Sequence, residues 1–359
     1  MFTKKIYPLS TVLKWTRRYI YYFIPISLVP VILYDILDWN WLHLPWLPIG
    51  LIGTALAFIS GFKNNASYGR LWEARKIYGG IVNSSRLLAT MLNDFITNEF
   101  TKEPKSEEEF FNIKKTIVLR HIAWMTALRH ALRAKKGWET THTNSSDKEH
   151  MSGIKVREYE FSLEEELQEY LSDVEMKDVL SMTNKQAACL KLQSKSFKEL
   201  KLAGLIDDFR HIEFKNLIEE FFGLQGKAER IKNFPYPRQF ATLNNFFVWI
   251  FVILLPFGLM NEFDLIGEEL LKAGSTNTIY NFIANHFVWL TIPFNIIISW
   301  VFMLMERVGD VSENPFEGMS NDVPITTISR GIEIDIREII GDTKESIPSQ
   351  HPELFNTQM

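Results

Sequence analysis

The chain has 359 residues, a hydrophobic fraction of 46% and a formal net charge of −4, which argues against nucleic acid as a partner. Its single cysteine, Cys189, excludes an intramolecular disulfide and a cysteine-based zinc site. The apolar residues are concentrated in separate zones, and residues 63–235 carry most of the charge.

Two apolar segments near the N-terminus are predicted to cross a membrane, at residues 19–34 and about 44–62. A helix needs roughly 20 mostly apolar residues to cross the hydrocarbon core, so both segments are slightly short. Pro25 and Pro30 lie in the first, which favours helices packed against neighbours over isolated anchors. Basic residues are spread over the first 18 positions and no small-residue cleavage site follows, which argues against a cleaved signal peptide.

The second apolar segment continues without a break signal into the polar sequence GFKNNASYGRLWEAR. Thr54, Phe58 and Phe62 recur at intervals of four residues. Because each four-residue step turns about 400° in a helix, the three side chains share one stripe about 12 Å long. A stripe of this kind is suited to lining a hydrophobic constriction, and the same spacing also suits a packing seam.

The region between the second and third apolar segments is predicted to consist of long helices with one exposed loop. Ser162 and Glu165 have the spacing of a capping box at the start of one helix. Leu163, Leu167, Tyr170, Leu171 and Val174 are predicted to share one face of that helix. The expected elements are a helix over 107–136, a polar exposed loop over 137–153, a helix over 161–180 and a helical stretch over 184–225.

Two further spans are predicted at about 241–260 and at 287–305, the latter without a charge in 19 residues. The tail after Glu306 mixes polar turns with the short amphipathic piece GIEIDIREII. The predicted fold is an all-α membrane protein with four transmembrane helices per subunit and a large helical cytosolic domain. Its expected divisions are 1–62 (N-terminal segment, spans one and two), 63–235 (cytosolic domain), 236–305 (spans three and four) and 306–359 (C-terminal clasp and tail).

The distribution of basic residues predicts the orientation. Lysines and arginines flank the spans at the N-terminal side of spans one and three and at the C-terminal side of spans two and four. The first connecting loop has no Lys or Arg, and the second has Lys272 alone against Glu262, Asp264, Glu268 and Glu269. The positive-inside rule therefore places both termini in the cytoplasm.

Sequence signatures of catalysis and of cofactor binding are weak. The eight histidines are dispersed, and no pair has the i, i+4 spacing with an acid that a helical zinc site needs. GLQGKAER lacks the spacing and the Lys-Ser/Thr pair of a phosphate loop, and the sequence has no nucleophile elbow or dinucleotide-binding fingerprint. We therefore expect no enzymatic activity, no cofactor and no bound metal.

A second distinctive stretch follows the fourth span and begins Glu306-Arg307-Val308-Gly309-Asp310. Turn-forming residues on both sides of an apolar side chain then predict a tightly folded segment. We call this segment the clasp, and we expect it to be structural and to need no ligand. The residues expected to form this clasp are Asn314, Pro315, Phe316, Asn321 and Asp322.

Together with GFKNNASYGRLWEAR, this stretch resembles the bestrophin family, and specifically its bacterial members, over about residues 15–340. The resemblance implies a homopentameric ion channel with one central pore in a lipid bilayer, here the bacterial inner membrane. It places the apolar pore neck at Thr54, Phe58 and Phe62, although Thr54 stands where a larger apolar residue is usual and would widen that end. It places a second constriction, the cytosolic aperture, at Tyr236.

The resemblance also bears on ions and gating. Animal bestrophins hold calcium in an acidic run after Asn-Pro-Phe, whereas residues 317–322 contain few acids here, so we expect calcium-independent gating. The family favours chloride-type anion conduction. The acidic second outer loop instead favours a channel for monovalent cations such as sodium or potassium. A third possibility is a membrane-anchored helical scaffold that does not conduct, for which one or two subunits are expected instead of five.

Overall fold

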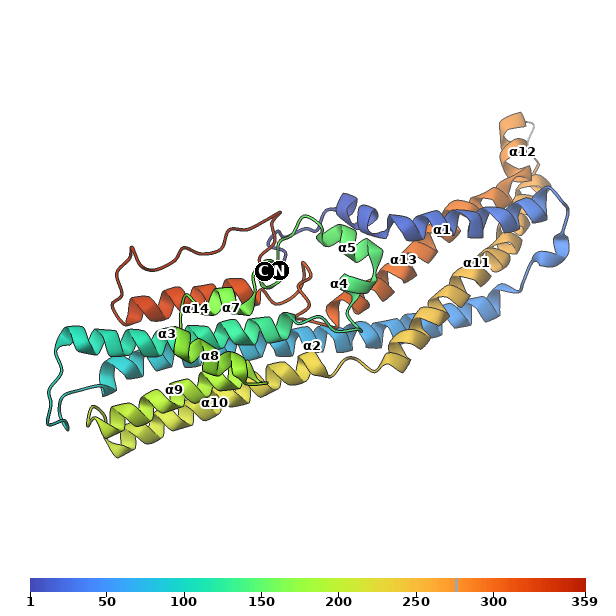
Figure 1. Ribbon diagram of the computed structural model, residues 1–359. Coiled ribbons are helices and arrows are strands. Elements are labelled where there is room, and N and C mark those ends of the chain that lie inside the picture. Colours follow the sequence, from blue (N-terminus) through green and yellow to red (C-terminus); the bar gives the residue numbers. More distant parts are fainter. Residues whose placement is uncertain (275–276) are drawn as a thin grey trace. The chain divides into compact units, whose positions relative to one another are not determined.

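The computed structural model describes residues 1–274 and 277–359, apart from the side chains at 141 and 142. This part of the chain is almost entirely helical, as the sequence predicts, and its only β-structure is two isolated bridges, Phe2 with Thr357 and Leu354 with Thr357. Figure 1 shows the helices. They are α1 (Leu9–Asp35), η1 (Asn40–Leu42), α2 (Trp46–Phe95), α3 (Glu107–Arg133), α4 (Thr140–Thr143), α5 (Ser145–Met151), α6 (Arg157–Glu160), α7 (Leu163–Leu167), α8 (Asp173–Ser181), α9 (Lys185–Leu202), α10 (Asp208–Asn233), α11 (Arg238–Lys272), α12 (Thr278–Asn285), η2 (Phe287–Leu290), α13 (Thr291–Ser312) and α14 (Ile325–Ile339).

The longest helix, α2, runs for 50 residues from Trp46 to Phe95. It confirms the prediction that the second apolar segment passes into the polar sequence without a break. The chain forms two compact units, and α2 contributes residues to both. Unit 1 comprises Met1–Lys5, Arg70–Pro235 and Asn314–Met359, and unit 2 comprises Ile6–Gly69 and Tyr236–Glu313.

Unit 2 holds the apolar helices. Phe23, Leu56 and Phe251 are at most 3% exposed in its core. Polar contacts join α1 to α13: the Asn295 amide nitrogen donates to the Ser27 hydroxyl at 2.6 Å, and the Trp300 ring N–H donates to Thr16 at 2.9 Å. These contacts satisfy side-chain polar groups inside an otherwise apolar bundle.

In the described part of the chain, three helical segments are long and apolar enough to cross a membrane: Asn40–Phe95, Arg238–Lys272 and Phe287–Ser312. They contain the second, third and fourth spans predicted from the sequence. The first predicted span lies in α1, which is not among the three. The N-terminal part of α1 carries Lys14, Arg17 and Arg18, which shortens the apolar part of this helix.

Unit 1 is built around α3, whose helical prediction is confirmed (Figure 1). Its start is fixed by a capping box in which the Glu109 backbone N–H donates to the Ser106 hydroxyl, and the Ser106 backbone N–H donates to the Glu109 carboxylate. Trp124 lies at its middle, fully buried, with its ring N–H donating to Gln225 of α10 at 3.0 Å. The apolar faces of α3, α9 and α10 form one continuous core.

The prediction of a single helix over 161–180 is wrong beyond the first turns of that helix. The capping box at Ser162 is present, but the helix it starts, α7, ends at Leu167, and α8 begins at Asp173. The backbone N–H of Ser172 donates to Glu175 at 3.1 Å, so a second cap starts a new helix. Val174, expected on the buried face, is consequently 79% exposed.

One other prediction also needs correction. Residues 137–153 are not an exposed loop, because Asp147 and Met151 of α5 are buried and the Asn144 side chain caps this short helix. The predicted helical stretch 184–225 is confirmed and consists of two helices, because α9 ends at Leu202. Gly204 follows with a φ of +70°, where an added Cβ would lie 2.7 Å from the carbonyl oxygen of Phe100. Glycine therefore permits the turn into α10.

Candidate functional site

The structure places the three predicted neck residues on one exposed face of α2. Phe58 is 67% exposed and Phe62 is 73% exposed, and Thr54 is also exposed. The Thr54 hydroxyl donates to the Gly50 carbonyl at 2.9 Å, within its own helix. Within the chain, therefore, the two rings are not the packing seam that their spacing also allowed.

The opposite face of α2 packs inside unit 2. Leu56, Ser60, Lys63 and Ser67 are each at most 2% exposed. At 100° per residue, the middle of this buried face lies about 180° from the middle of the stripe formed by Thr54, Phe58 and Phe62. The helix thus has one face anchored within the subunit and one aromatic face left free.

The anchored face carries a buried ionic cluster. The Lys63 ammonium lies 2.5 Å from a carboxylate oxygen of Glu306 and 2.5 Å from one of Asp310. The Asn244 amide also donates to Glu306, and Arg307 lies 3.1 Å from the second Asp310 oxygen. Sequence reasoning singled out this stretch of α13 only as part of a family motif. The sequence did carry a signal for this contact: Lys63 directly follows one apolar segment, and Glu306 directly follows another apolar segment.

Tyr236, the predicted aperture, lies just before α11 and is half-buried. Its ring centroid is 6.4 Å from that of Phe240, and its carbonyl accepts a hydrogen bond from Arg238 at 2.9 Å. In unit 1, Phe209 at the start of α10 is 81% exposed, the largest exposed fraction of any aromatic side chain among the described residues. Sequence reasoning did not single out Phe209.

The predicted clasp is a compact turn within unit 1. Phe316 is 1% exposed, its ring centroid lies 5.9 Å from that of Tyr78, and its carbonyl accepts from Arg133 at 3.0 Å. The Val323 backbone N–H donates to the Pro315 carbonyl at 3.1 Å, which closes the turn. Asn314 is 6% exposed, whereas Asn321 is exposed to solvent.

Asp322 supports this turn from inside. One carboxylate oxygen accepts the backbone N–H groups of Gly318 at 2.7 Å and Met319 at 2.9 Å. Burial raises the pKa of Asp322 to about 6, against the opposing effects of Arg133 and the two N–H groups. In the part of the chain that the structure describes, no three His, Cys, Asp or Glu side chains lie close enough together to hold a metal ion.

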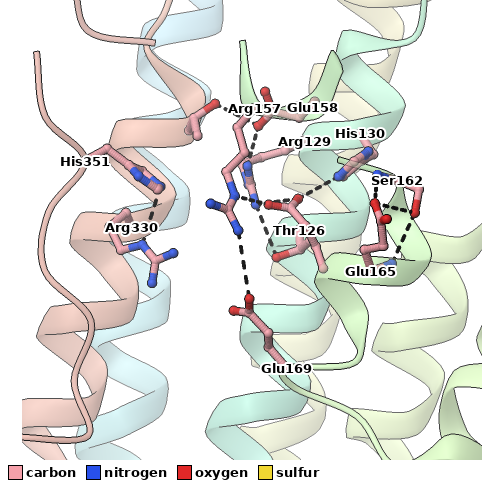
Figure 2. A network of polar contacts seen from close by, with 12 residues as sticks. Thr126, Arg129, His130, Arg157, Glu158, Ser162, Glu165, Glu169, Arg330 and His351 are labelled. Atoms are coloured by element: carbon pink, nitrogen blue, oxygen red, sulfur yellow. Dashed lines mark hydrogen bonds and ion pairs between the residues drawn. The ribbon is translucent and has the colours of Figure 1, made fainter. Parts of the chain in front are cut away.

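A larger ionic network joins α3 to the segments around α6, α7 and α14 (Figure 2). Glu166, 3% exposed, contacts Arg129 at 3.2 Å, His130 at 2.6 Å and Arg157. Burial alone would raise the pKa of Glu166, but the hydrogen bond from His130 and the charges of Arg129 and Arg157 lower it to about 2. This network fixes the helices of unit 1, and nothing in it resembles a catalytic arrangement.

Comparison with known proteins decides the family. The sequence model described as "Bacterial/Fungal Bestrophin protein" matches residues 8–269 and 282–338. The chain belongs to the bestrophin family. A bacterial bestrophin homologue from Klebsiella pneumoniae shares this fold with a TM-score of 0.69 and 21% identity, over 90% of this chain and 98% of that one.

Two curated relatives of this bestrophin are named as channel-forming proteins. The voltage-dependent anion channel-forming protein RSc3414 of Ralstonia nicotianae is 25% identical over 309 residues, which are 84% of this chain and 82% of the relative. The voltage-dependent anion channel-forming protein YneE of Escherichia coli K12 is 22% identical over 310 residues, 86% of this chain and 82% of the relative. Both relatives are channel-forming proteins, and neither name describes an enzyme.

Proposed function

We propose that this bestrophin is a homopentameric channel that passes monovalent anions, chloride among them, through one axial pore lined by α2. The observation that carries the proposal is the aromatic stripe of α2, which is exposed along its length while the opposite face of the same helix is anchored. The names of the curated relatives support anion conduction.

A ring of subunits explains why the stripe is exposed in one chain. One subunit supplies one such helix, so a closed passage requires several copies related by rotational symmetry. Five copies are what the bestrophin family implies. Native mass of the purified protein tests this number: five subunits agree with the channel, whereas one or two favour the scaffold.

The neck would act as a dry constriction. Rings of Phe58 and Phe62 around an axis exclude water, and hydrophobic constrictions gate by dewetting. Thr54, with its hydroxyl bonded to its own helix, would form a wider end. Replacing Phe58 and Phe62 together by alanine is expected to raise single-channel conductance in planar bilayers. Unchanged currents would place the constriction elsewhere.

The alternative of a cation channel rests on four acids near the outer mouth. The structure places all four in the last turns of α11 and not in a loop. Asp264 accepts the Tyr34 hydroxyl at 2.6 Å, and Glu268 lies 3.2 Å from Lys272. These contacts fix the positions of Asp264 and Glu268 but do not change the charge of the segment, so it still favours cations near the mouth, against the names of the relatives. Reversal potentials with unequal potassium chloride on the two sides decide the question, because their sign follows the more permeant ion.

We also propose that the channel opens without calcium. Calcium takes six to eight oxygen ligands. In the clasp, one oxygen of Asp322 is already occupied by two backbone N–H groups, and Arg133 lies 3.9 Å from it. Currents that rise reversibly when micromolar calcium is added to reconstituted channels would contradict this proposal.

We propose that Tyr236, whose half-buried ring precedes α11, forms the cytosolic aperture. Tyr236→Ala is expected to raise conductance if the residue narrows the passage. Phe209→Ala is the matched comparison, because Phe209 is the more exposed aromatic side chain. A change in conductance with Phe209→Ala alone would move the second constriction to the start of α10.

The proposed location is the bacterial inner membrane, with four crossings and both termini in the cytoplasm. α1 supports the fourth crossing, because 27 residues at 1.5 Å per residue extend about 40 Å. Cysteines introduced at either end of the chain are expected to resist impermeant thiol reagents in intact cells. Labelling of one end but not the other would mean an odd number of crossings.

A further inference from the structure

Lys63 follows Phe62 directly in α2, yet its side chain is only 2% exposed. Lysines near the ends of membrane helices commonly extend toward water along their flexible stems. Here the ammonium is instead turned into unit 2. Since an unpaired buried charge is strongly unfavourable, this position is stable only while its partners are in reach.

Those partners all come from unit 2. Glu306 and Asp310 are four residues apart on α13 and present one carboxylate oxygen each to Lys63. Arg307 pairs with the other oxygen of Asp310, and the Asn244 amide donates to the other oxygen of Glu306. The four charges therefore sum to zero, and removing any one of them leaves a charge uncompensated.

The two helices approach closely at this point. A Cβ added at Gly309 of α13 would lie 2.4 Å from the Asn64 side-chain oxygen and 3.4 Å from Cε of Lys63. The glycine therefore gives α2 the room to bring its lysine between the two acids. The contact constrains both the distance between the helices and the direction in which Lys63 points.

We propose that Lys63 is a positioning residue that sets the rotation of α2 about its own axis, so that Phe58 and Phe62 stay on the free face. The inference rests on the proposed function, in which that face lines the neck. A turn of about 100° would bring Ala57 or Ile59 to the place of Phe58 and withdraw the ammonium from both carboxylates. The ionic cluster thus selects which side chains an ion meets.

Thiol labelling of the full chain in liposomes tests the rotation without measuring current. Cys189 is fully buried, so the chain without added cysteine measures the background. Single cysteines replace Phe58 on the free face and Leu56, 1% exposed, on the anchored face. The Phe58→Cys site is expected to react faster than the Leu56→Cys site, because the small thiol replaces the ring that excludes water on the free face.

Adding Lys63→Met is expected to lower the ratio of the Phe58→Cys labelling rate to the Leu56→Cys labelling rate by about tenfold. The reason is that the native rotation of α2 would then be only a minor state. The reversed pair Lys63→Glu with Glu306→Lys is expected to restore the ratio in part, because the new carboxylate regains a cation but lies beside Asp310. A general loss of structure would restore none of it. A wild-type ratio with Lys63→Met would overturn the proposal.

If Lys63→Met fails to fold, Glu306→Gln replaces it, since this variant keeps the contact between Lys63 and Asp310. A partial fall in the ratio supports the inference, and a wild-type ratio overturns it. The proposed function is tested separately, by currents. If it is wrong, the Phe58 and Phe62 variants would show absent or unchanged currents, while the labelling ratios would still report the rotation of α2.

Discussion

The ionic network of Figure 2 allows a stability prediction with a defined pH dependence. The perturbation is Glu166→Gln, which removes a buried carboxylate from among Arg129, His130 and Arg157. The pKa of Glu166 is lowered from 4.5 to about 2 in the folded protein. At about 1.4 kcal/mol per pKa unit, the ionised group contributes about 3 kcal/mol to folding at neutral pH.

The sign of the pH dependence follows from the direction of the shift. Because the folded pKa lies below the unfolded value, the contribution is present in full above about pH 4.5 and is lost as the pH falls toward about 2. At neutral pH, about 3 kcal/mol corresponds to a decrease of roughly 6 to 12 °C in Tm for a unit of this size. The wild type and the variant should converge in acid.

Thermal unfolding in detergent, followed by circular dichroism between pH 3 and pH 7, measures this difference. Glu164→Gln is the matched control, because Glu164 lies in the same helix but is exposed. Its Tm should stay close to that of the wild type. A Glu166→Gln deficit that is the same at every pH would refute the reasoning, since it would then come from packing and not from the charge.

Three further variants can be measured in the same unfolding assay at neutral pH. Phe316→Ala removes a buried ring from the clasp and should cost about 3–5 kcal/mol; a loss below about 1 kcal/mol would mean that the turn does not depend on this anchor. Ser106→Ala removes the cap of α3 and should cost about 1 kcal/mol, whereas an unchanged Tm would show that Glu109 alone suffices. Gly204→Ala should cost at least about 1–2 kcal/mol, because its φ is positive and the Phe100 carbonyl is close, and a stabilised variant would contradict the turn geometry.

Several features could be predicted from the sequence because they depend on neighbours along the chain. The course of α2 through the polar sequence follows from the absence of a break signal, and the common stripe of Phe58 and Phe62 follows from helix geometry alone. The start of the helix at Ser162 followed from a four-residue capping pattern. Each of these inferences depends only on residues that are neighbours along the chain.

Other features depend on distant partners and were missed. The contact between Lys63 and Glu306 joins residues 243 positions apart, so no local pattern reveals it. The break before α8 was overlooked because Ser172 and Glu175 form a second capping pair inside a segment whose apolar spacing looked continuous. The burial of Asp147 depends on the packing of unit 1 and not on the polar composition of its own segment.

On the free face of α2, the side chains change from aromatic to small or polar directly after Phe62. After Phe62, the same side of the helix presents Asn65, Ala66 and Gly69, all exposed. In the proposed channel, a permeating ion would lose its water shell for only about one helical turn, from Phe58 to Phe62, before amide groups and open space allowed it to rehydrate. The energy barrier would then depend on the length of this dehydrated stretch, and an aromatic side chain at position 66 would lengthen it by one turn.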